Sequence, residues 1–138
     1  MISTVAVGTD GSQTAREAVR QAAEIARRFD AKLVLLSVFE DSAGQPREDV
    51  ELEWVRNPAA RVRTLLERLE SDLRREGIEC VTRSDSGDPA KVLIRLADES
   101  GADLLVIGNK GMNRRVLGSV PKSVTHNADC SVLVVKTT

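Results

Sequence analysis

The sequence predicts one α/β domain, doubly wound about a five-stranded parallel sheet with helices on both faces. Short runs rich in Val, Leu and Ile alternate with segments whose apolar residues recur at helical spacing. A strand, a helix and a further strand, repeated along one chain, imply right-handed crossovers and parallel strands. The 138 residues have the length of one domain, so we expect residues 1–138 to fold as a unit.

The predicted strands lie at residues 2–8, 32–39, 78–83, 103–108 and 131–136. The first, second and fourth are continuously apolar, which is typical of parallel strands buried on both faces. The third mixes charged residues with apolar ones, so we expect it at an edge of the sheet. By analogy with common doubly wound sheets, the expected strand order is 3-2-1-4-5.

The predicted helices begin after Ser12, after Asn57, after Asp88 and near residue 120. The first three are residue types that cap helix N-termini, and Pro58 and Pro89 suit the first helical position. Gly77 and Gly101 follow the second and third helical patterns and are expected to end them.

Residues 40–56 form a longer connection than is usual between a strand and a helix. The segment is acidic, and Val50, Leu52 and Trp54 alternate with acidic residues. This alternation suggests that one side packs against something. Three interpretations stay open: a lid over a ligand, a surface for a partner, or a segment folded back on its own domain.

Composition excludes several classes of function. The net charge is -1, so an electrostatic nucleic-acid surface is not expected. Aromatic residues make up only 2%, too few for a platform on which bases stack. No apolar run is long enough to cross a membrane, and the first residues do not resemble a signal peptide. We therefore expect a cytoplasmic protein.

Two cysteines and one histidine limit the chemistry further. Cys80 and Cys130 cannot form a disulfide framework, and with His126 they are too few for a zinc cluster. In the expected order the two cysteines lie four strand spacings apart, roughly 19 Å, which no disulfide spans. Nothing places a nucleophile beside His126, so a catalytic triad is not expected.

Glycines gather where a ligand is expected to bind. Open α/β sheets bind ligands at the carboxyl ends of the strands where the strand order reverses, here between strands one and four. Strand one ends in GTDGS, residues 8–12, and strand four ends in GNKG, residues 108–111. Gly118 and Ser119 then lead into a helix whose backbone N–H groups suit a phosphate.

The glycine pattern is a weak signal when it is taken alone. It fits neither GxxxxGK[ST] nor GxGxxG. The glycines could merely form turns and cap a helix, and Asp10 could merely cap a turn.

In combination these motifs resemble the universal stress protein family. The resemblance rests on the GTDGS opening, on PAKVLIRLADESGADLLVIGNKG at residues 89–111, and on Gly118-Ser119 before the final SVLVV. It covers the whole chain apart from residues 40–56. It implies a five-stranded α/β fold that usually forms dimers, and in some members an ATP site.

The resemblance also implies roles for particular residues. Asp10 would face the nucleoside, the backbone of Val38 would meet the adenine edge, and the glycine loop would hold ribose and phosphates. By matching positions, the resemblance implies Asp10, Val38, Gly108, Gly111, Gly118, Ser119 and Val120 at the site. With their neighbours Gly8, Thr9 and Asn109 and the nearby basic residues Lys110, Arg114 and Arg115, they make up the predicted nucleotide site.

The glycine loop is shorter than in the ATP-binding members. Six residues, MNRRVL, separate Gly111 from Gly118, where about nine are usual in that family pattern. Lys110, Arg114 and Arg115 could compensate as phosphate partners, or they could be solvated surface charges.

The resulting hypothesis is a regulatory protein that binds ATP, with or without Mg²⁺, and acts as a sensor or scaffold in a stress response. We expect no efficient turnover, at most a weak ATPase. The alternative is an interaction module of the same fold that binds AMP or cyclic AMP instead.

We also expect a homodimer through strand 131–136, because that strand is apolar on both faces yet lies at a sheet edge. The sequence does not identify a protein partner.

Overall fold

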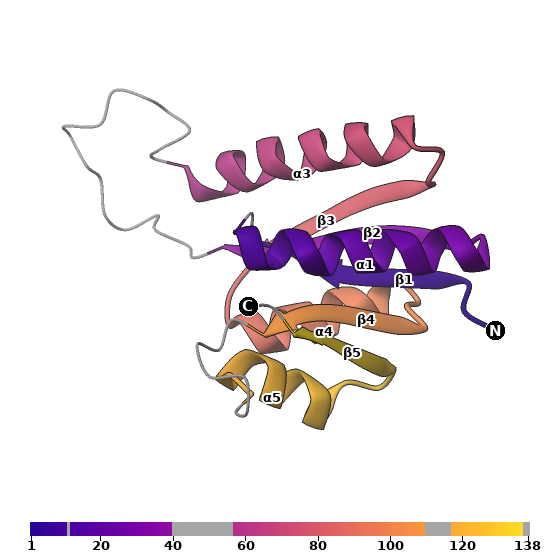
Figure 1. The fold of residues 1–138 in the computed structure, drawn as a ribbon. Helices are drawn as coiled ribbons and strands as arrows, with labels where there is room; N and C mark the ends of the chain where they lie inside the picture. Colours follow the sequence, from indigo (N-terminus) through magenta and orange to yellow (C-terminus); the bar gives the residue numbers. More distant parts are fainter. Residues whose placement is uncertain (11, 40–56, 110–116, 137–138) are drawn as a thin grey trace.

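The computed structural model of the chain describes residues 1–10, 12–39, 57–109 and 117–136 (Figure 1). Strands and helices alternate along it, as the hydrophobic pattern predicts. The strands are β1 (Thr4–Gly8), β2 (Lys32–Phe39), β3 (Cys80–Ser86), β4 (Leu104–Asn109) and β5 (Ser131–Lys136). The helices are α1 (Gln13–Phe29), α3 (Pro58–Arg75), α4 (Pro89–Glu99) and α5 (Ser119–Asn127).

The five strands form one parallel sheet in the order β3-β2-β1-β4-β5, which confirms the predicted order. β1 lies at the centre, where Ala6 pairs with Val34 of β2 on one side and with Leu105 of β4 on the other. All three of these residues are fully buried. Continuous apolar runs mark the three inner strands because both faces of each strand are covered.

Two layers of helices cover the sheet (Figure 1). Helices α1 and α3 pack on one face, against a core that includes Val5 and Val7 of β1. Helices α4 and α5 pack on the opposite face, against a core that includes Ala6. The side chains of β1 thus alternate between the two cores, as side chains of a strand must.

Side-chain caps fix the starts of three helices. The side chains of Ser12, Asn57 and Asp88 each accept a hydrogen bond from the backbone N–H three residues further along. Gly77 and Gly101 follow α3 and α4 with φ of +84° and +68°, a conformation that favours glycine. The predicted caps and helix ends are therefore confirmed.

The third strand differs from its predicted boundaries. It runs over Cys80–Ser86, two residues later at its start and three later at its end than residues 78–83. Ile78 is still tied to the end of α3, because its N–H donates to the Leu73 carbonyl at 3.2 Å. The strand extends to Ser86 because it continues to pair with β2 as far as Phe39. The polar residues in this stretch interrupt the hydrophobic pattern, so hydrophobicity alone does not predict the full strand.

The remaining predictions concern the cysteines, the membrane and the long connection. Cys80 and Cys130 are both free thiols. Among the described helices, none combines the length and the apolar character that a membrane span requires. Residues 40–56, for which three interpretations stay open, lie outside the described residues.

Candidate functional site

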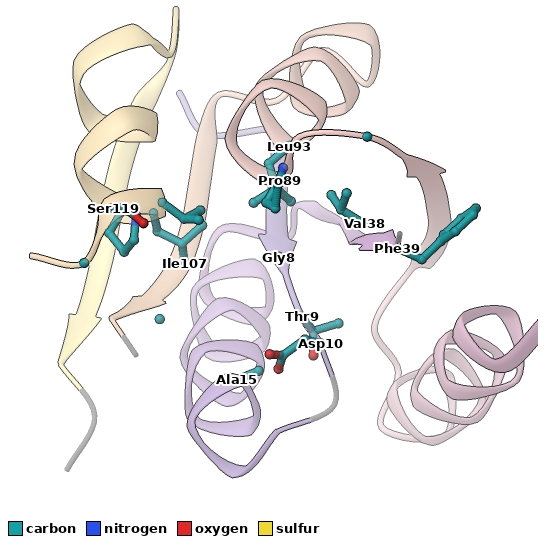
Figure 2. Close-up of a pocket in the computed structure, with 15 residues that line it drawn as sticks. Gly8, Thr9, Asp10, Ala15, Val38, Phe39, Pro89, Leu93, Ile107 and Ser119 are labelled. Atoms are coloured by element: carbon teal, nitrogen blue, oxygen red, sulfur yellow. The ribbon is translucent and has the colours of Figure 1, made fainter. Parts of the chain in front are cut away.

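A pocket of about 480 Å³ opens at the carboxyl ends of β1 and β4 (Figure 2). It lies where the strand order reverses, because β1 is flanked by β2 on one side and by β4 on the other. The predicted site residues that line it are Gly8, Thr9, Asp10, Val38, Gly108, Gly118, Ser119 and Val120. The parallel sheet thus brings to one place residues that lie far apart in the sequence.

Further residues line the same pocket, and the sequence reasoning missed them. They are Ala15, Phe39, Gly87, Pro89, Leu93, Ile107 and Pro121. Most are apolar and come from the starts of helices or from the ends of strands next to the predicted residues. Ala15, Leu93 and Ile107 are buried core residues, whereas Gly87 and Pro89 are exposed. Only the packing of the helices shows which of these residues border the pocket.

Gly8, the last residue of β1, lines the pocket (Figure 2), and the packing around it explains why it is glycine. A Cβ at this position would lie 3.1 Å from Leu93 Cδ2 and 3.7 Å from Ile107 Cγ2. The first distance is shorter than ordinary van der Waals contact. The missing side chain therefore leaves room between β1 and the first turns of α4.

Asp10 has a structural contact and also lines the pocket. Its Oδ1 accepts a hydrogen bond from the backbone N–H of Ser12 at 2.9 Å, so the side chain caps the turn before α1. The preceding residue, Thr9, is buried and donates its N–H to the Leu36 carbonyl at 2.8 Å. Capping the turn and facing a ligand are thus compatible, because the turn fixes the carboxylate at the rim of the pocket.

The end of β2 and the turn before α4 form another wall. The Gly87 N–H donates to the Phe39 carbonyl at 3.4 Å, which joins the turn to the last residue of β2. Gly87 has a φ of +135°, and a Cβ there would lie 3.0 Å from Val92 Cγ2. The backbone conformation therefore favours glycine at this position, and Val92 would have to shift to admit a Cβ. Val38 and Phe39 lie at the same end of the pocket (Figure 2).

The start of α5 forms the opposite side of the pocket (Figure 2). Gly118 is the residue before the helix, and Ser119 is its first helical residue. Asn109, the last residue of β4, is 5% exposed, and its Oδ1 accepts a hydrogen bond from the Gly118 N–H at 3.0 Å. Asn109 is outside the lining but is hydrogen-bonded to Gly118, which is part of it. The predicted residues Lys110, Gly111, Arg114 and Arg115 lie outside the described residues.

The described lining is mainly apolar, and Asp10 carries its only charged side chain. Outside the pocket, the hydrogen bond with Arg95 lowers the pKa of Asp85. Within the described ranges, no group of three His, Cys, Asp or Glu side chains could hold a metal ion. The arrangement suits a ligand with an apolar, flat part and a polar part that meets backbone N–H groups and one carboxylate.

The fold and the pocket define an open α/β domain whose ligand pocket lies at the reversal of strand order. The chain belongs to the universal stress protein family, whose family model matches residues 1–136. It is 39% identical to the universal stress protein Rv1636 of Mycobacterium tuberculosis, over 98% of this chain and 97% of that protein.

Two solved structures agree with this assignment. A universal stress protein in complex with cAMP superposes with a TM-score of 0.75 at 33% identity, covering 99% of this chain and 98% of its own. The universal stress protein from Archaeoglobus fulgidus in complex with dAMP gives a TM-score of 0.72 at 25% identity, covering 97% of this chain and 98% of its own. Both of these relatives thus hold an adenine nucleotide.

Proposed function

We propose that the chain binds an adenine nucleotide, with ATP as the first candidate, in the pocket at the carboxyl ends of β1 and β4. The observation that carries this proposal is the shared lining: one pocket joins the ends of β1, β2 and β4 with the start of α5. The protein would act in the cytoplasm as a sensor or scaffold of a stress response, with nucleotide binding shifting its conformation or its choice of partner.

The nucleotide is proposed to lie across the pocket, with its base and phosphates at opposite ends. Its base would meet the backbone of Val38, in the mainly apolar part of the lining. Asp10 would accept a hydrogen bond from the ribose. The phosphates would meet the backbone N–H groups at the start of α5, beside Gly118 and Ser119. Any Mg²⁺ would be held by the ATP phosphates themselves.

The residues beyond β4 remain part of the proposal on sequence grounds alone. Gly111 would supply backbone N–H groups, and Lys110, Arg114 and Arg115 would pair with the outer phosphates. Contacts from long side chains near solvent are weakened by salt. The preference for ATP over AMP is therefore expected to shrink as the salt concentration rises.

A second candidate is a protein of the same family that binds an adenosine monophosphate, including cyclic AMP. One observation favours it: the two solved relatives described above are complexes with cAMP and with dAMP. The short MNRRVL segment favours it as well, because the loop has few residues with which to surround three phosphates. In both candidates the protein binds the nucleotide without efficient turnover.

Calorimetric titration with ATP, ADP, AMP and cyclic AMP tests the proposal and separates the two candidates, with GTP as the control for the base. At a nucleotide concentration of one hundred times Kd, binding stabilises the folded protein by about 2.7 kcal/mol. For a domain of this size, we expect the melting temperature to rise by roughly 5 to 15 °C. Mass spectrometry of the nucleotide that co-purifies gives an independent answer. No binding of any adenine nucleotide would contradict the proposal.

We also propose that two copies pair through β5. Residues 132–134 are only half-buried in one chain, and they lie in the strand at the edge of the sheet. A two-fold axis would let the two β5 strands pair antiparallel and would cover both edges.

A further inference from the structure

Asn109 differs from Gly8 and Gly108, the other predicted site residues in β1 and β4, because it does not line the pocket. Its buried carboxamide reaches across nine residues of sequence to accept a hydrogen bond from the Gly118 N–H at 3.0 Å. We propose that Asn109 is a positioning residue, a clamp that holds Gly118 and Ser119 against the end of β4. Its effect on ligands rests on the proposed nucleotide function.

The start of α5 needs such an anchor. Ser12, Asn57 and Asp88 cap the other three described helices through their own side chains, whereas α5 follows Gly118, which has none. Helix α5 is also the shortest of the four, with nine residues, and only Pro121 and Val124 in it are buried. The carboxamide of Asn109 supplies from β4 the fixed contact that a capping side chain supplies elsewhere.

The packing around Gly118 agrees with this role. A Cβ on Gly118 would lie 3.5 Å from Asn109 Oδ1 and 3.6 Å from the Pro121 Cδ. Gly118 is therefore held between the end of β4 and the first turn of α5. A buried carboxamide is costly unless it is hydrogen-bonded, so this contact also explains why a polar side chain is buried at this position.

The clamp acts on one end of the pocket only. Ser119 lies at the side of α5, whereas Val38 and Phe39 lie at the other end (Figure 2). Losing the clamp would therefore weaken the binding of the part of a ligand that touches Gly118 and Ser119. In the proposed orientation this is the phosphate part. The base and the ribose would keep their contacts with β1 and β2.

The first test compares Asn109→Ala with Asn57→Ala in titrations with adenosine, AMP and ATP. Asn57 is a matched control, because its Oδ1 also accepts from a backbone N–H, that of Ala60 at 3.3 Å, but at the start of α3 and outside the pocket. We expect Asn109→Ala to weaken the binding of AMP and ATP about 5- to 10-fold, which is the effect of about one hydrogen bond. The binding of adenosine should weaken less than about 2-fold. Asn57→Ala should change none of the three. Equal losses for adenosine and AMP, or no loss, would overturn the proposal.

The second test measures the clamp without any ligand. In NMR hydrogen exchange, the Gly118 amide should exchange at least about tenfold faster in Asn109→Ala than in the parent, because its acceptor is lost. It should stay protected in Asn109→Asp, which keeps an acceptor oxygen in the same place, and in Asn57→Ala. Unchanged exchange in Asn109→Ala would overturn the clamp.

Two further outcomes are a variant that does not fold and a parent protein that does not bind, and in both the clamp can still be tested apart from the proposed function. If Asn109→Ala does not fold, loss of Gly118 protection in Asn109→Asp overturns the clamp, and retained protection supports it. A parent protein that binds none of the three ligands would refute the proposed function, and hydrogen exchange at Gly118 would still decide whether the clamp exists.

Discussion

Gly8 lies so close to Leu93 that a Cβ on Gly8 would be 3.1 Å from Leu93 Cδ2. Both residues line the pocket, so a side chain at position 8 would compete with Leu93 for space there. The obstructing atom is the end of a flexible side chain, which can move to admit one methyl group. It cannot as easily admit a branched side chain, because Leu93 is itself buried.

We therefore expect Gly8→Ala to change the free energy of unfolding by less than about 1 kcal/mol, and Gly8→Val to lower it by about 1 to 3 kcal/mol through overpacking. Nucleotide affinity should fall more in the valine variant, since its larger side chain takes more of the space beside Leu93 in the pocket. Urea unfolding and calorimetric titration measure the two effects.

A double-mutant cycle identifies the cause. Leu93→Ala alone should cost about 2 to 5 kcal/mol of stability because it leaves a cavity. Added to Gly8→Val, it should cost clearly less, since the valine fills part of that space. Simple additivity of the two changes would show that the Gly8–Leu93 contact is not what excludes the larger residue.

Asp10 allows its charge to be separated from its hydrogen bond. Asp10→Asn keeps an acceptor for the Ser12 N–H but removes the charge, and Asp10→Ala removes both. Because a charged acceptor binds a hydroxyl more strongly than a neutral one, we expect adenosine affinity to fall about 3-fold in Asp10→Asn and 10-fold or more in Asp10→Ala. Calorimetry measures both values.

Asp129→Ala is the matched control, because Asp129 is exposed just before β5, at the amino ends of the strands and away from the pocket. Its adenosine affinity should equal that of the parent. If Asp10→Ala also binds like the parent, the carboxylate serves only the turn before α1.

The sequence predicts the sheet and the strand ends well, for a physical reason. Parallel strands buried on both faces need continuous apolar runs, and helix caps need particular side chains, so both are visible in the sequence. Gly8 and Gly118 follow from the same topology, because all carboxyl ends meet at one edge. The bounds of the edge strand β3 are predicted less well, since its polar residues carry no hydrophobic pattern.

The apolar wall of the pocket could not be predicted in this way. Leu93 and Pro89 look like ordinary residues of α4, and only the packing of that helix over Gly8 brings them to the pocket. The contact between Asn109 and Gly118 is likewise tertiary, because no local rule pairs residues nine apart. Side chains that gain their role from packing between elements leave little trace in a single sequence.

Asp103 makes the stability of the fold depend on pH. Its carboxylate accepts the backbone N–H groups of Ser3 and Thr4, at 2.8 and 3.0 Å, and these hydrogen bonds lower its pKa. A carboxyl whose folded pKa is lowered stabilises the fold above its unfolded pKa of about 3.9 and loses that effect as the pH falls through the folded pKa. Asp103 thus contributes at neutral pH and not in strong acid.

Asp103→Asn should therefore be less stable than the parent at pH ~6, and the difference should shrink steadily below pH ~4. Urea midpoints at a series of pH values measure it. A difference that stays constant across this range would mean that the charge of Asp103 has no part in holding the start of β1.

The last prediction concerns the two edges of the sheet, which differ in their protection. On β3, Arg83 pairs with Glu99 at 3.0 Å and Asp85 pairs with Arg95, so charged side chains line that edge. On β5, the half-buried residues 132–134 are all apolar. Since charges discourage a strand from pairing with another chain, the proposed dimer should use β5 and not β3.

Val134→Asp should give monomers or aggregates in light scattering, because the new carboxylate would be buried against the second copy. Thr82→Asp is the matched control: it places the same charge at a half-buried position of β3 and should leave the mass at that of two chains. Circular dichroism on both variants separates loss of the interface from loss of the fold. A Val134→Asp protein that keeps its fold and the dimer mass would show that the chains do not pair through β5.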